Sequence, residues 1–146
     1  MLVLDGESFT SGRSKFFDQH PKFVETTAKI FVKVTLIGYD EPVMAQLDTG
    51  AAYSILETEV AERMGLFNWE GHPTRLGTRL GTINGQIIRL PLTLVADDGI
   101  SLDLNSPFFV SREWRGVTFL GYIGLIDRLR IALDSPANLF YFGEED

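Results

Sequence analysis

Short apolar segments separated by turn residues make up most of the chain. Residues 29–37 are rich in β-branched side chains, residues 38–42 contain glycine, aspartate and proline, and residues 43–47 are again mostly apolar. Two strand-like segments on either side of such turn residues are typical of a β-hairpin. We therefore expect the first regular structure of the chain to be a hairpin over residues 29–47.

A second, longer hairpin is expected in the middle of the chain. Residues 75–80 and 86–96 have strand character, and the stretch 81–85 between them contains two glycines. Glycine supplies the backbone freedom that a reversal needs, so we expect 81–85 to be a flexible hairpin tip.

The remaining strands are short, and only two segments have helical character. Further strands are expected at 100–104, 108–110, 117–120, 131–134 and 139–142. Residues 57–64 place apolar side chains at helical spacing, carry acidic residues in the first turn and are followed by Gly65, which predicts a short helix. Residues 125–130 can form one helical turn or two. The predicted class is all-β with two short helices.

The beginning of the chain has no such regularity. Residues 1–27 show neither alternation nor helical periodicity. We expect an irregular N-terminal arm over residues 1–28, which completes the sheet of a dimer, blocks a cleft or is removed by self-cleavage, and one domain over residues 29–146. Residues 34–40 and 92–98 share a strand-turn pattern, which indicates either a pseudo-twofold repeat or the ordinary likeness of any two strand-turn segments.

Composition restricts the chemistry that the chain can perform. It has 146 residues, no cysteine and two histidines, His20 and His72, which we expect at the surface. Disulfides, thiolate chemistry and zinc-ligand spacing are therefore excluded, and we expect neither metal nor cofactor. The net charge is −7 and the 13 lysines and arginines are scattered, which argues against nucleic-acid binding. Because no apolar run is long enough for a membrane span, we expect a cytoplasmic protein.

Residues 43–56 carry the most specific motif. Asp48, Thr49, Gly50 and Ala51 follow an apolar strand and precede a second, mostly apolar stretch. This segment resembles the active-site segment of the retropepsin-like (retroviral-type) aspartic proteases. The family has two further hallmarks, a pair of apolar residues followed by glycine and a glycine-rich hairpin called the flap. The matching residues are Phe119, Leu120 and Gly121 for the former and Gly81, Thr82, Ile83, Asn84 and Gly85 for the flap.

The resemblance implies a closed β-barrel, one lobe of the acid-protease fold, that dimerises across a twofold axis. By the same resemblance Asp48 is the catalytic acid, Thr49 bonds across the two subunits, Gly50 lets its N–H approach the carboxylate, Ala51 lines the floor and Ile83 covers the substrate. Hydrolysis by carboxylates requires one ionised and one protonated acid. The chain has one such motif, so we expect a homodimer with an Asp48/Asp48 dyad that cleaves extended peptides.

The chain departs from the viral pattern at two positions. Many retroviral members pair an acid near the active-site glycine with an arginine after the second glycine, and these positions hold Ala52 and Tyr122. Some cellular members also lack this pair, so the likeness is closer to cellular or bacterial members. The alternative function is a catalytically inactive dimeric module that binds peptides. Gly124 competes with Gly121 as the second glycine, which we prefer because Phe119 and Leu120 precede it.

Overall fold

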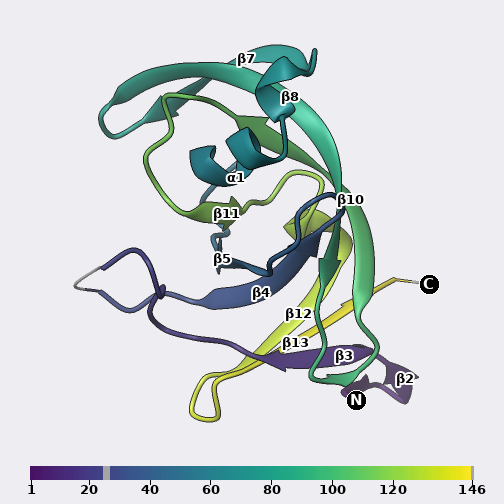
Figure 1. Ribbon diagram of the computed structural model, residues 1–146. Coiled ribbons are helices and arrows are strands. Elements are labelled where there is room, and N and C mark those ends of the chain that lie inside the picture. Colours follow the sequence, from purple (N-terminus) through teal and green to yellow (C-terminus); the bar gives the residue numbers. More distant parts are fainter. Residues whose placement is uncertain (25–26, 146) are drawn as a thin grey trace.

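The computed structural model describes residues 1–24 and 27–145 (Figure 1). The strands are β1 (Val3–Leu4), β2 (Glu7–Ser8), β3 (Gly12–Lys15), β4 (Phe31–Leu36), β5 (Val43–Leu47), β6 (Ser54–Ile55), β7 (His72–Thr78), β8 (Gly81–Leu94), β9 (Asp98–Gly99), β10 (Leu102–Val110), β11 (Thr118–Leu120), β12 (Leu129–Asp134) and β13 (Leu139–Glu144). The helical segments are α1 (Thr58–Arg63), η1 (Leu66–Asn68) and η2 (Ile126–Arg128). The predicted all-β class with short helices is confirmed.

A closed barrel forms the centre of the molecule. Its strands belong to one sheet in the order β10-β6-β11-β5-β4-β8-β7, and an additional pairing of β10 with β8 closes 6 of them into a barrel. β7 lies outside this closure, so the β7–β8 hairpin projects from the barrel (Figure 1). A second sheet, in the order β12-β13-β3-β9, lies at the opposite end of the molecule. The fold is that of one retropepsin-like lobe.

The first predicted hairpin is present as β4 and β5. Val34 pairs with Val43 and Phe31 with Gln46, and the turn between the strands contains Gly38 with φ +90°. The side chains of β4 alternate toward the core beyond Val32, as expected of a half-buried strand. This register fixes where β5 ends and the motif begins.

The second predicted hairpin is present, but its turn was placed wrongly. Thr78 pairs with Gly81, so the turn consists of Arg79 and Leu80, and residues 81–85 belong to β8. Gly81 has φ +121° and accounts for the sharp reversal. Gly85 serves packing instead, because a Cβ there would lie 2.5 Å from the carbonyl oxygen of Val110.

Strand β10 contains two segments that we predicted to be separate strands. Its pairing with β8 runs without interruption from Leu102 opposite Leu94 to Val110 opposite Gln86, through Pro107. The break predicted between 104 and 108 is therefore absent. The second predicted helix is a single 3-10 turn, η2, because β12 begins at Leu129.

The N-terminal residues contain strands where we expected an irregular arm. β3 pairs with β13 on one side and with β9 on the other. Gly12 and Ser14 face inward, and a Cβ at Gly12 would meet the carbonyl oxygen of Ile100 and the ring of Phe142. Small inward residues leave no apolar alternation to detect, which is why the sequence pattern missed this strand. The division into an arm and a domain stays a prediction.

The two segments with the shared strand-turn pattern lie side by side. β4 and β8 pair antiparallel with Thr35 opposite Thr93, so residues 34–36 and 92–94 are related by a local twofold rotation. Strand β5, which leads into Asp48, pairs in parallel with β11, which leads into Gly121. Any two antiparallel strands are related by such a local rotation, so the pairing of β4 with β8 agrees with both interpretations of the shared pattern.

None of the helical segments in the described part of the chain combines the length and the apolar character that crossing a membrane requires.

Candidate active site

Asp48 lies where β5 ends, and its carboxylate is held by the following turn. Its backbone N–H donates to the carbonyl oxygen of Leu120 at 3.0 Å. The N–H of Gly50 donates to Oδ1 of Asp48 at 2.8 Å, and the N–H of Ala51 donates to the carbonyl oxygen of Asp48 at 3.2 Å. These hydrogen bonds fix the direction in which the side chain of Asp48 points. The turn therefore presents a half-buried, oriented acid.

Gly121 lies where the loop after β11 contacts the segment that follows the Asp48 turn. Its N–H donates to Oγ of Ser54 at 2.9 Å in a buried position. An added Cβ would collide with the backbone of Tyr53 and Ser54, which explains why this position needs glycine. Gly124, the alternative, instead approaches the ring of Pro107.

Main-chain hydrogen bonds join the two loops at the positions where the viral ion pair is missing. The N–H of Tyr122 donates to the carbonyl oxygen of Ala51 at 2.8 Å, and the N–H of Ile123 donates to that of Ala52 at 2.8 Å. The loops are thus held together without a buried charge pair, whose desolvation is costly.

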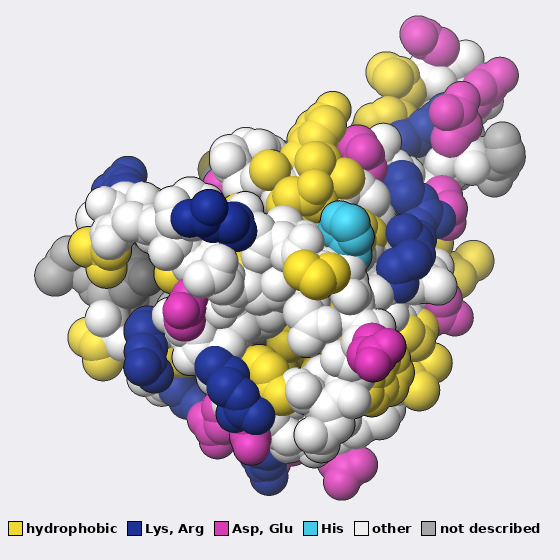
Figure 2. Space-filling model, turned by 90° about the horizontal axis from the view of Figure 1, so that it is seen from above, with side chains coloured by type: hydrophobic (Ala, Val, Ile, Leu, Met, Phe, Trp, Pro, Cys, Tyr) yellow, Lys and Arg dark blue, Asp and Glu magenta, His cyan; other side chains and the backbone are white. Residues whose placement is uncertain are grey.

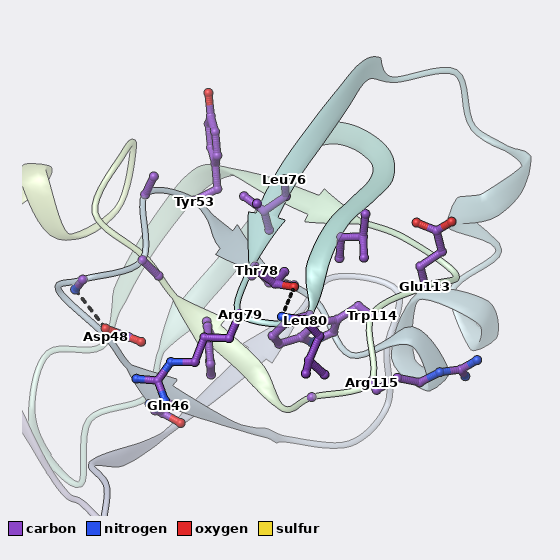
Figure 3. Close-up of a pocket in the computed structure, with 18 of the residues that line it drawn as sticks. Gln46, Asp48, Tyr53, Leu76, Thr78, Arg79, Leu80, Glu113, Trp114 and Arg115 are labelled. Carbon is purple, nitrogen blue, oxygen red and sulfur yellow. Dashed lines mark hydrogen bonds between the residues drawn. The ribbon is translucent and has the colours of Figure 1, made fainter.

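A cleft of about 1150 Å³ opens beside Asp48 (Figure 3). Of the residues predicted from the sequence, Asp48, Gly50, Ala51, Ile83 and Phe119 line it. The predicted residues that do not line it are Thr49, Gly81, Thr82, Asn84, Gly85, Leu120 and Gly121. Thr49 is exposed on the Asp48 turn.

Two parts of the cleft were not predicted from the sequence. The first is the true hairpin turn, where Arg79 and Leu80 face the cleft and Oγ1 of Thr78 accepts the N–H of Leu80 at 3.2 Å. The second is the loop 113–116 before β11. The glycine that follows Leu80 directly was an available signal for the turn. The loop residues come together only through tertiary contacts.

The loop before β11 holds the base of the hairpin. Oγ of Ser111 donates to the carbonyl oxygen of Asn84 at 2.5 Å, and Oε2 of Glu113 accepts the N–H of Asn84 at 2.6 Å. The Trp114 ring packs edge-on against Phe119, with 5.4 Å between ring centroids. Asn84 is therefore held by contacts from outside the hairpin as well as by its pairing with β7.

His20 is buried, which corrects the prediction of two surface histidines. Its Nδ1 accepts the N–H of Lys22 at 2.9 Å, so Nδ1 carries no proton. Its Nε2 lies 3.5 Å from Oε1 of Glu57. Burial raises the pKa of Glu57, and a hydrogen bond from the backbone of Thr118 partly offsets it. This contact ties the N-terminal residues to the segment that follows the Asp48 loop.

Within the described residues, no group of three or more His, Cys, Asp or Glu side chains is arranged to hold a metal ion. Basic side chains on the face seen in Figure 2 lie in separate patches with acidic ones among them. The acidic side chains that line the cleft are those of Asp48 and Glu113.

Comparison with known proteins agrees with this geometry. The aspartyl protease family model matches residues 32–124. The structure is similar to a retropepsin-like aspartic protease from Rickettsia conorii, with a TM-score of 0.59, 18% identity and coverage of 90% of this chain and 91% of that one. It is also similar to the retroviral protease-like domain of Ddi1 from Leishmania major, with a TM-score of 0.52, 18% identity and coverage of 81% and 94%. No curated protein sequence gives a significant match. The family model spans more than half of the chain, from β4 through the Asp48 loop to Gly124, and the protein therefore belongs to the aspartyl protease family.

Proposed function

We propose that the protein is an active endopeptidase that works as a homodimer with one catalytic carboxylate, Asp48, from each subunit. The observation that carries this proposal is the oriented Asp48 carboxylate at the floor of a cleft with the β7–β8 hairpin over it. Two carboxylates about 3 Å apart share one proton, so one acts as the base toward water while the other polarises the peptide carbonyl. Thr49 and Gly50 are exposed beside Asp48, which leaves this surface available to the second subunit.

The substrate in this proposal is an extended peptide held between the Asp48 loop and the hairpin. Ile83 and Leu76 contribute apolar surface from the hairpin, and Phe119 does so from β11. Closing the hairpin over the peptide excludes water from the reacting amide, which strengthens the electrostatic interactions there. The predicted absence of a cofactor is consistent with such chemistry.

The first experiment compares the wild type with Asp48→Asn on a peptide library between pH 4 and 7.5. We expect cleavage by the wild type and loss of at least about 10³-fold in the variant, because the amide cannot act as a base. Asp40→Asn is a matched control, since Asp40 is an exposed turn residue away from the cleft. Equal cleavage by the wild type and Asp48→Asn contradicts the proposal.

A mixing experiment tests the shared site. Wild-type and Asp48→Asn subunits are unfolded together at equal concentration and refolded. If each site needs two Asp48 carboxylates, activity falls to about one quarter of the wild type, whereas a site within one chain retains about one half. A value of one half at subunit concentrations that support dimers would overturn the dyad.

The second candidate function is peptide binding without turnover. The observation that favours it is the lack of the viral ion pair at Ala52 and Tyr122. The backbone hydrogen bonds between the two loops replace the structural part of that pair, so we prefer the active enzyme. Binding that is equal in the wild type and Asp48→Asn, together with no cleavage, supports the binding module.

A further inference from the structure

The cleft beside Asp48 carries more positive charge than the protein as a whole. Its charged lining residues are three cations, Lys29, Arg79 and Arg115, and two acids, Asp48 and Glu113. The whole chain has a net charge of −7. The charged side chains that line the cleft therefore have a net positive charge, whereas the whole chain has a net negative charge.

The two acids of the cleft are already engaged, and the cations are not. Asp48 accepts the N–H of Gly50, and Glu113 accepts the N–H of Asn84. Across the described residues, 1–24 and 27–145, no hydrogen bond, ion pair or ring contact involves the side-chain charge of the three cations. Their charges are free to meet a ligand.

Arg79 is the best placed of the three cations. It occupies the two-residue turn of the β7–β8 hairpin, at the end farthest from the clamp on Asn84. Figure 3 shows its side chain running from the turn toward Gln46 and Asp48, whereas Arg115 points away from Asp48. A guanidinium presents a rigid fork of donors that matches a carboxylate with two parallel hydrogen bonds.

We propose that Arg79 selects peptides with an aspartate or glutamate close to the cleaved bond. This inference rests on the proposed function, since the peptide has to lie beneath the hairpin. Lys29, which lines the same cleft, adds to the positive potential at that place. The general field of an acidic protein favours basic peptides, so a preference for acidic ones requires a local cause.

The test uses one peptide that the wild type cleaves, resynthesised with Glu, Gln or Lys at each position around the cleaved bond. At one position we expect kcat/KM to be about 5- to 30-fold higher for Glu than for Gln, the range of a charge-assisted hydrogen bond at a partly exposed site. Arg79→Glu should abolish this preference and favour Lys at that position. Arg75→Glu is the matched control, because Arg75 is exposed on the same hairpin, does not line the cleft and carries the same charge change.

Three outcomes overturn the inference. They are no preference for Glu over Gln at any position, a preference that Arg79→Glu leaves unchanged, or a preference that Arg75→Glu reduces as much as Arg79→Glu does. An equal loss of kcat/KM for the Glu and Gln peptides in Arg79→Glu is an example of the second outcome, because Arg79 then acts on the reaction and not on the choice of peptide. If the wild type cleaves no peptide, the proposed function has failed. The selectivity is then read from binding of fluorescein-labelled Glu-rich and Lys-rich octapeptides to the Asp48→Asn protein, with the same two hairpin variants. Tighter binding of the Glu-rich peptide that Arg79→Glu reverses supports the inference, and any other result refutes it.

Discussion

Replacing Gly121 by alanine tests the close contact between the loop after β11 and the segment that follows the Asp48 turn. The added Cβ would lie against the backbone of Tyr53 and Ser54. Backbone atoms within a closed barrel cannot turn aside as a flexible side chain can, so the two loops have to separate. Separation also breaks the buried hydrogen bond from Gly121 N–H to Ser54 Oγ. A steric cost of about 1–3 kcal/mol and a buried hydrogen bond of about 1–3 kcal/mol give a loss of about 4 kcal/mol in the free energy of unfolding.

For a chain of this length, such a loss lowers Tm by about 8–16 °C. Urea titration followed by circular dichroism measures the same quantity, with all variants at one protein concentration because a dimer is stabilised by mass action. The matched control is Gly77→Ala, since Gly77 has φ outside the left-handed region and an added Cβ meets nothing within 4 Å. We expect the control to change stability by less than about 1 kcal/mol. A Gly121→Ala protein as stable as this control would refute the account of this contact.

Three further predictions concern the hairpin, the buried acid and the dimer. Glu113→Ala should speed hydrogen exchange of the Asn84 amide about tenfold, because the Asn84 N–H loses the carboxylate that accepts its hydrogen bond. Glu113→Gln keeps an acceptor and should change this exchange rate little. Equal exchange rates in both variants would contradict the contact between Glu113 and Asn84. Burial raises the pKa of Glu57 above 4.5, so the folded state binds its proton more tightly, and the stability gained by protonation is lost as pH rises through the raised value. Denaturation from pH 3.5 to 7.5 should therefore show Glu57→Gln gaining stability relative to the wild type as pH rises above 4.5, and a constant difference would exclude this cause. If the proposed dimer forms, Ile123→Glu should weaken dimerisation at least about tenfold in analytical ultracentrifugation. The reason is that Ile123 is 43% exposed and its N–H bonds to the carbonyl oxygen of Ala52 beside the Asp48 loop. An unchanged dimerisation constant would mean that the interface lies elsewhere.

Features determined by neighbouring residues could be predicted from the sequence. The β4–β5 hairpin follows from β-branched segments around a glycine-containing turn, and the helix at 57–64 follows from its spacing and from Gly65. The Asp48 motif is local as well, because Gly50 reaches the carboxylate two residues away. In each case the physical cause lies within a few positions of its effect.

Features caused by distant residues could not be predicted in this way. Gly85 resembles a turn residue in the sequence, but Phe109 and Val110 of β10 are what exclude a side chain there. β3 forms because β13 offers it a partner, with Tyr141 opposite Arg13. His20 is buried because the chain folds its ring between Phe23 and Phe31. Local patterns contain none of these contacts.

A contact between residues that are distant in the sequence also bears on where a second catalytic acid can come from. The chain builds two loops that meet at one place, since the Asp48 N–H bonds to Leu120 and the Gly121 N–H bonds to Ser54. Only the first loop carries an acid. In the second, this contact leaves no space for any side chain at Gly121, so a carboxylate cannot be supplied from that position without pushing the loops apart. In the proposed function the second acid is Asp48 of another subunit, and the exposed Thr49 and Gly50 lie on the same turn as Asp48. In that proposal, the close packing that requires glycine at position 121 is also the reason why the second loop does not supply an acid from that position.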